Sequence, residues 1–181
     1  MKMKLAASIL ALLLLGAFAL GAQDSLSLSQ TKSNPRVDGV IADGEYALTA
    51  NALDMQINLS WTGEILSVGV SGQTSGWVAV GLGSSVMNDA IIYIGFMSGD
   101  QAQLKVQKGA GHRHGDLDSN APLKYAVQEQ SGQTTLEIAL KASSFIARGQ
   151  KQLDLIFAMG GAKSFASMHK ARYTATVSLT Q

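Results

Sequence analysis

Apolar and polar residues alternate over most of the chain after residue 50. In the segment LDMQINLSW, residues 53–61, every second residue is apolar, namely Leu53, Met55, Ile57, Leu59 and Trp61. The same period of two recurs in EILSVGVSG at 64–72, TTLEIALK at 134–141 and RYTATVSLT at 172–180. Because successive side chains of a strand point to opposite faces, this pattern predicts strands with one buried and one solvated face.

Three stretches are apolar on both faces and differ from this pattern. They are WVAVGLG at 77–83, AIIYIGFM at 90–97 and, less completely, LDLIFAMGG at 153–161. Strands of this kind lie in sheets that are covered on both sides, so we expect a covering layer or a ligand over their second face. Helix signals are weak, and only KASSFIARG at 141–149 has the pattern of a short helical segment.

The number and spacing of these segments predict the fold class. About nine or ten short strands, separated by turns rich in Gly, Ser and Asn, are typical of an all-β antiparallel β-sandwich. We expect one such domain over residues 36–181. Residues 23–35 are polar and mixed, and we interpret them as a flexible leader or a loose first strand.

The first 22 residues have the pattern of a secretory signal peptide. A basic start, MKMK, precedes the 16-residue apolar run LAASILALLLLGAFAL and the small-residue exit GAQ. The alternative is an uncleaved membrane anchor, but a spanning helix needs roughly 20 apolar residues. No cysteine follows the run, which disfavours a lipid-anchored protein. We therefore predict cleavage after Ala22 and a periplasmic or secreted protein.

Composition narrows the chemistry of such an exported domain. The absence of cysteine excludes thiolate nucleophiles, Cys-based zinc sites, iron–sulfur clusters and covalently attached haem c. Loss of Lys2 and Lys4 with the signal peptide changes the formal net charge from +1 to −1. With no basic run in the chain, we expect neither nucleic acid nor anionic lipid as a partner. No nucleophile-elbow, Walker or dinucleotide-binding motif occurs, so we expect no enzymatic activity.

The loop GLGSSVMNDA at 81–90 contains an unexpected methionine among ordinary turn residues. Met87 follows one predicted strand and His169 precedes the last, so a sandwich can bring them to one end. A thioether sulfur and an imidazole nitrogen together form an axial pair for haem iron. Side chains suited to line a haem slot are Trp77, Ile92, Tyr93, Phe96, Phe157 and Phe165. From spacing alone the simpler interpretation stays open, that Met87 fills a gap and His169 is a surface residue.

Two further segments have residues that bind metal ions in other proteins. In GAGHRHGDLDSN at 109–120, His112 and His114 alternate with one another and precede two aspartates, a pattern compatible with zinc or copper. The alternative is a solvated loop between strands. The Asp-Gly pairs at 38–39 and 43–44 would suit calcium, but tight turns explain them more simply.

The order of the motifs resembles the DOMON domain family in its small secreted prokaryotic form. The resemblance is carried by VDGVIADGEY at 37–46, GWVAVGLGSSVMNDAIIYIG at 76–95, TTLEIAL at 134–140 and SFASMHKAR at 164–172. It covers about residues 36–180, and it implies an immunoglobulin-like β-sandwich of about ten strands that binds haem b or sugars. In haem-binding members, such as the cytochrome domain of cellobiose dehydrogenase, a methionine and a histidine ligate the iron, at positions that correspond to Met87 and His169. A lysine replaces the histidine in related haem subunits, so the resemblance makes Lys163 and Lys170 spare candidates.

Two functions follow as expectations. The first is a non-covalent haem b protein that transfers electrons to a separate redox protein or membrane cytochrome, with Met87 and His169 on the iron and Trp77, Tyr93 and Phe165 at the haem. The alternative is a non-enzymatic carbohydrate-binding module without haem, which would stack sugar rings on exposed aromatic residues. Aromatic residues make up only 6% of the chain, and the alternation predicts that Trp61 and Trp77 are buried, which disfavours the alternative.

Overall fold

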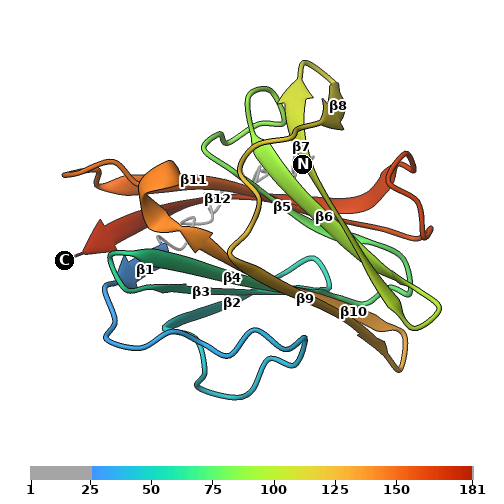
Figure 1. Ribbon diagram of the computed structural model, residues 1–181, viewed down its shortest axis with the longest axis horizontal. Helices are drawn as coiled ribbons and strands as arrows, with labels where there is room; N and C mark the ends of the chain where they lie inside the picture. Colours follow the sequence, from blue (N-terminus) through green and yellow to red (C-terminus); the bar gives the residue numbers. More distant parts are fainter. Residues whose placement is uncertain (1–25, 181) are drawn as a thin grey trace, which may run out of the picture.

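The computed structural model describes residues 26–180, which form twelve β-strands and one short 3-10 helix. The strands pack as two layers, seen edge-on in Figure 1. The signal peptide predicted for residues 1–22 lies outside the described residues. The strands are β1 (Leu26–Ser29), β2 (Leu48–Ala52), β3 (Met55–Trp61), β4 (Ile65–Gly72), β5 (Val78–Leu82), β6 (Ile91–Ser98), β7 (Gln101–Ala110), β8 (Arg113–Asp116), β9 (Lys124–Gln130), β10 (Gln133–Lys141), β11 (Gln152–Gly160) and β12 (His169–Thr180), with the 3-10 helix η1 (Ala142–Ser144) after β10.

One layer is a seven-stranded sheet in the order β1-β12-β11-β5-β6-β7-β8, and the other is a five-stranded sheet in the order β2-β3-β4-β10-β9. All ladders between these strands are antiparallel except the one that joins β1 to β12. The prediction of an all-β antiparallel sandwich is therefore confirmed. No helix described between residues 26 and 180 is long and apolar enough to cross a membrane.

The main core lies between the two sheets and follows the period of two. Inward-facing side chains of the central strands, such as Val68, Ile138 and Phe157, are at most 1% exposed. The alternation fails at Leu53, which is 60% exposed. Leu53 and Asp54 form the turn between β2 and β3 with φ angles of 50° and 62°, so the buried face of β3 begins only at Met55.

Residues 26–30 belong to the sandwich, which corrects the interpretation of 23–35 as a flexible leader. β1 pairs with β12 in parallel, and Leu28 lies fully buried in the main core. The backbone N–H of Gln30 donates to the carbonyl of Thr180 at 3.0 Å. The other interpretation, a first strand, agrees with the structure from Leu26 onward.

Candidate functional site

A second apolar cluster lies on the outer face of the seven-stranded sheet, away from the main core. Alternate residues of β5, β6 and β11 point outward and meet the residues just before β5 and β6. This outer cluster explains why the sequence of these strands is apolar on both faces. Its buried members are Trp77, Ala79, Ala90, Ile92, Ile94 and Phe96, and its partly buried members are Met87, Ile156, Ala158 and Phe165.

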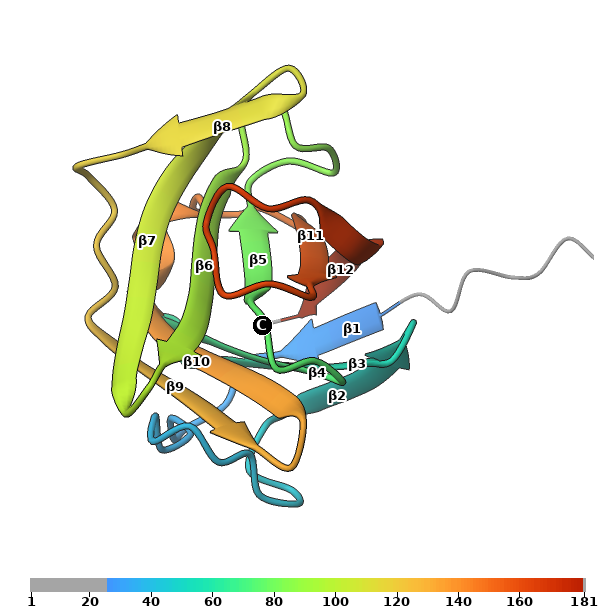
Figure 2. The same cartoon turned by 90° about the vertical axis from the view of Figure 1, so that its right-hand side faces the viewer.

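Two loops cover the outer cluster. The 83–90 loop joins β5 to β6, and the 161–168 loop joins β11 to β12 and passes beside β5 and β6, in red in Figure 2. Phe165 in the second loop packs on Phe96 of β6, with ring centroids 4.7 Å apart. The ammonium of Lys105 on β7 lies 5.4 Å from the Phe165 ring. The covering layer expected from the sequence is thus made partly by the chain itself.

Trp77 connects the sheet to the 161–168 loop. Its indole N–H donates to the hydroxyl of Ser167 at 2.8 Å, and its side chain is 5% exposed. A Cβ at Gly160 would lie 2.3 Å from the indole ring, so only glycine leaves room for this ring against β11. The Gly160 carbonyl accepts a hydrogen bond from the Thr74 hydroxyl at 2.7 Å. Close packing on Gly160 therefore fixes the indole at the edge of the outer cluster.

Met87 reaches the outer cluster from a loop that is held against β7. The Ala90 N–H donates to the Met87 carbonyl at 3.2 Å, and the Gly109 N–H donates to the Ala90 carbonyl at 2.9 Å. A Cβ at Gly109 would lie 1.7 Å from the Met87 carbonyl oxygen, so the approach requires glycine. The Met87 side chain packs against the outer cluster and is partly buried.

A β-bulge decides on which face His169 lies. Met159 of β11 pairs with Ala171, but the next residue, Gly160, pairs with His169, so Lys170 is the extra residue. Residues directly opposite one another share a face of the sheet. Met159 faces the main core and Gly160 faces the Trp77 indole, so the register puts His169 on the face of the outer cluster. Without the bulge, simple alternation would put His169 on the same face as Ala171.

The register also shows a row of apolar and charged side chains that the sequence alone does not reveal. Ala158 of β11 lies between Arg172 of β12 and Ala79 of β5, and Ala79 lies opposite Ile94 of β6. Ile94 in turn lies opposite Lys105 of β7. The centre of this row is apolar, and each of its two ends has a cation. Only the strand register reveals this row, because its members come from five different strands.

Of the predicted site residues, the structure brings Met87, Trp77 and Phe165 into contact with one cluster and puts His169 on the same face. Tyr93 lies elsewhere, which corrects its expected place beside a haem. Its side chain is fully buried in the main core, and its hydroxyl donates to the Asn120 carbonyl at 2.7 Å. Burial raises the pKa of Tyr93, so it stays protonated. Phe157 also lies in the main core.

The histidines of the metal alternative have a different environment. His112 lies in the turn between β7 and β8, whereas His114 on β8 forms a 2.7 Å hydrogen bond to Gln107 through Nδ1. Asp116 bonds to Lys105 and Gln107, and the hydrogen bond from Lys105 contributes most to lowering the pKa of this carboxyl. No group of three or more His, Cys, Asp or Glu side chains within residues 26–180 is arranged to hold a metal ion.

Lys163 and Lys170, the alternative ligand candidates, have hydrogen-bond or ion-pair partners, and the two Asp-Gly pairs form turns. The ammonium of Lys170 donates to the Gln73 carbonyl at 2.6 Å, and that of Lys163 pairs with Glu129 at 2.6 Å. Gly39 and Gly44 have φ angles of 91° and 74°, which agrees with tight turns at both Asp-Gly pairs.

Comparison with solved structures identifies the fold. The cytochrome b domain of pyranose dehydrogenase from Coprinopsis cinerea is similar with a TM-score of 0.55 and 10% identity, over 69% of this chain and 76% of that domain. The cytochrome domain of cellobiose dehydrogenase from Myriococcum thermophilum is similar with a TM-score of 0.58 and 10% identity, over 76% of this chain and 85% of that domain. The fold is therefore DOMON-like.

The remaining comparisons do not extend the assignment of the fold. A putative carbohydrate-binding protein from Bacteroides uniformis is 14% identical, over 86% of this chain and 99% of that protein, with a TM-score of 0.45. No protein-family model and no curated protein matches the sequence. The likeness to the cytochrome domains shows the DOMON-like fold, and the function of this chain has to be argued from its own residues.

Proposed function

We propose that this DOMON-like domain binds haem b non-covalently at the outer cluster and transfers electrons, and that Met87 and His169 would ligate the haem iron. The observation that carries the proposal is the β-bulge at Lys170, which puts His169 on the same face as Met87. The donor set fits the cofactor, because a thioether and a neutral imidazole together ligate haem iron in electron-transfer proteins.

Each part of the site has a role toward the cofactor. When bound, haem supplies an iron that gains and loses one electron. The outer cluster would exclude water from the ring, and the aromatic side chains of Trp77, Phe96 and Phe165 would contact its faces or edges. Arg172 and Lys105, at the two ends of the row, would bind the carboxylates of haem. Met87 and His169 are uncharged donors, which favours the reduced iron and raises the reduction potential.

The experiment is reconstitution of the purified mature chain with haem, followed by absorption spectra of the oxidised and reduced forms. We expect a Soret band and the sharp α and β bands of six-coordinate low-spin iron. Met87→Ala should give a high-spin or water-ligated iron with a lower potential, and His169→Ala should abolish stable binding.

Matched controls come from the same chain. Met168 is 85% exposed and precedes His169, so Met168→Ala tests whether any nearby thioether serves. His114→Ala tests whether an imidazole other than that of His169 serves as the ligand. Both control variants should give the spectrum of the unchanged chain. The ligand assignment is wrong if Met87→Ala and His169→Ala leave the spectrum unaltered.

The proposal also covers location and partner. The signal-peptide pattern of residues 1–22 supports export, and the electron partner would be a separate redox protein or a membrane cytochrome. The proposed role needs no acid–base residue, and we propose that the domain is not itself an enzyme. Periplasmic or secreted location is tested by fractionation of cells that express the full chain, where uncleaved protein in the cytoplasm would contradict it.

A further inference from the structure

A buried glutamine lies beside the outer cluster, at a part of the sheet that is otherwise exposed. Gln107 of β7 is 5% exposed, although all four residues of β8, which pairs with this end of β7, are exposed. On β6 it lies opposite Ile92, a buried member of the outer cluster. Because opposite residues share a face of the sheet, the Gln107 side chain lies on the face of the outer cluster. A buried amide needs hydrogen-bond partners, and those of Gln107 indicate its role.

The hydrogen bonds of Gln107 fix the orientation of its amide. Nε2 donates to Oδ1 of Asp116 at 2.8 Å, and Oε1 lies 2.7 Å from Nδ1 of His114. The ionised carboxylate of Asp116 has no proton to donate, so the amide nitrogen must face it. The amide oxygen then faces His114, and Nδ1 of that ring must have the proton. The charge of Asp116 therefore sets the amide, and the tautomer of His114 reports its orientation.

Asp116 connects the buried amide to Lys105. Its second carboxylate oxygen, Oδ2, accepts a hydrogen bond from the Lys105 ammonium. The same ammonium lies 5.4 Å from the centroid of the Phe165 ring, in the loop that covers the outer cluster. Lys105 is therefore held from two sides, at one end of the row described above. An ammonium has three N–H donors, so this arrangement leaves donors for a further acceptor.

The cation at the other end of the row has less support. Arg172 takes part in no ion pair within residues 26–180. A long side chain loses rotamer freedom when a ligand immobilises it, and a side chain that is already held loses less. Lys105 is therefore preorganised to bind an anionic group at the edge of the outer cluster, and its preorganisation depends on Asp116 and Gln107.

We propose that Gln107 is a positioning residue for haem: through Asp116 it holds the Lys105 ammonium where a carboxylate of haem would bind. This inference rests on the proposed function and adds a residue that acts on the cofactor only through another side chain. Without the Gln107 amide, Asp116 and Lys105 regain rotamer freedom, which haem binding must then remove. The ligands of the iron are not affected.

The test is haem loss from the reconstituted mature chain into an excess of apomyoglobin, followed in the Soret region. Gln107→Leu removes the amide without changing the charge, and it should speed haem loss about threefold to tenfold while the low-spin spectrum stays unchanged. Lys105→Met should speed haem loss at least as much. Asp116→Glu keeps the carboxylate and should stay close to the unchanged chain. The matched control is Gln101→Leu at the exposed start of β7, which should leave the rate unaltered.

A double variant shows whether Gln107 acts through Lys105. In the Lys105→Met background, Gln107→Leu should have little further effect on haem loss, because the group that it positions is gone. An equal effect in both backgrounds would mean that Gln107 supports only the fold, and it would overturn the proposal. An unaltered rate of haem loss in Gln107→Leu alone would also overturn it.

A second readout needs no haem. At pH 8, where imidazoles are mostly neutral, ¹⁵N NMR of the haem-free mature chain should show His114 with its proton on Nδ1. The pKa of Asp116, which the hydrogen bonds from Lys105 and Gln107 lower, should rise in Gln107→Leu and stay low in Gln101→Leu. A proton on Nε2, or an unaltered pKa of Asp116, would contradict the positioning role. These outcomes would refute this inference alone, whereas a missing Soret band in the unchanged chain would refute the haem proposal as well.

Discussion

Replacement of Glu137 by alanine should destabilise the domain strongly, because this carboxylate accepts hydrogen bonds from three donors. The substitution leaves the N–H groups of Asp38 and Gly39 and the Tyr46 hydroxyl without their acceptor. Each orphaned buried donor costs about 1–3 kcal/mol, and removal of the carboxylate recovers part of its own desolvation penalty. We expect a net loss of about 3–5 kcal/mol in the free energy of unfolding, which lowers the Tm by about 10 °C.

The assay is urea unfolding of the mature chain, followed by tryptophan fluorescence. Glu64→Ala is the matched control, because Glu64 is exposed in the β3–β4 turn and should change stability by less than about 0.5 kcal/mol. Glu137→Gln keeps one acceptor oxygen and should fall between the two. A decrease of less than about 1 kcal/mol in the free energy of unfolding of Glu137→Ala would refute a stabilising role for the Glu137 hydrogen bonds.

The same carboxyl predicts a pH dependence. Burial raises the pKa of Glu137 above its ordinary value of 4.5, although the hydrogen bonds from Tyr46, Gly39 and Asp38 oppose this. The native state therefore binds the proton more tightly than the unfolded chain does. The Glu137 contribution to the free energy of unfolding should decrease as pH rises from 4.5 through the raised pKa. Glu137→Gln should remove this part of the pH dependence, and an unchanged profile would contradict the assignment.

Three other substitutions test particular contacts. Gly109→Ala should displace the 83–90 loop, because the new Cβ would overlap the Met87 carbonyl. The displaced loop should speed the loss of haem from the reconstituted protein. An unaltered rate of haem loss would argue against a role of this loop in holding haem. Gly160→Ala should move the Trp77 indole and change its fluorescence maximum, and an unchanged spectrum would contradict the close packing. Tyr93→Phe should cost about 1 kcal/mol through its lost hydrogen bond and leave the haem spectrum unchanged, whereas an altered Soret band would restore Tyr93 to the site.

The sequence predicts the layered β-fold well because a period of two follows directly from strand geometry. It also predicts a second apolar face on β5 and β6, which is the outer cluster. It cannot tell which residues of AIIYIGFM face outward, because both faces are apolar. For this reason the sequence suggests Tyr93 as a residue that could line a haem slot, although its side chain lies in the main core.

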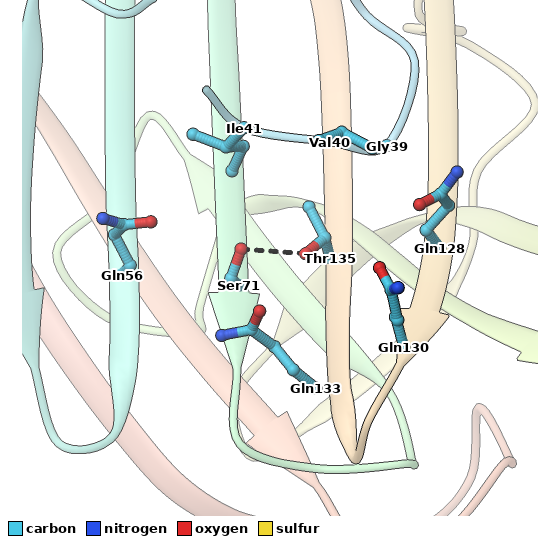
Figure 3. A pocket seen from close by; sticks show the side chains of 9 residues that line it. All are labelled: Gly39, Val40, Ile41, Gln56, Ser71, Gln128, Gln130, Gln133 and Thr135. Atoms are coloured by element: carbon cyan, nitrogen blue, oxygen red, sulfur yellow. Dashed lines mark hydrogen bonds between the residues drawn. The ribbon is translucent and has the colours of Figure 1, made fainter. Parts of the chain in front are cut away.

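Two features of the sites depend on register, which the sequence does not specify. The face on which His169 lies is decided by the extra residue Lys170, and nothing in SMHKAR marks that bulge. The polar pocket on the outer face of the five-stranded sheet, lined by Gln56, Gln128, Gln130 and Gln133 (Figure 3), is not predicted because its members come from four strands and a loop. A signal was present in VQEQSGQTT, where Gln128, Gln130 and Gln133 cluster around one hairpin turn, and outward alternation puts them on one face.

The central claim is that Met87 of the outer cluster and His169, on the same face of the sheet, share a haem iron. A crystal structure of the haem-loaded mature chain tests it most directly. We predict iron between the Met87 sulfur and a His169 ring nitrogen, with the macrocycle against the outer face of β5 and β6. Iron bound instead by Met168, Lys170 or the His112–His114 turn, or haem located away from this face, would contradict the account.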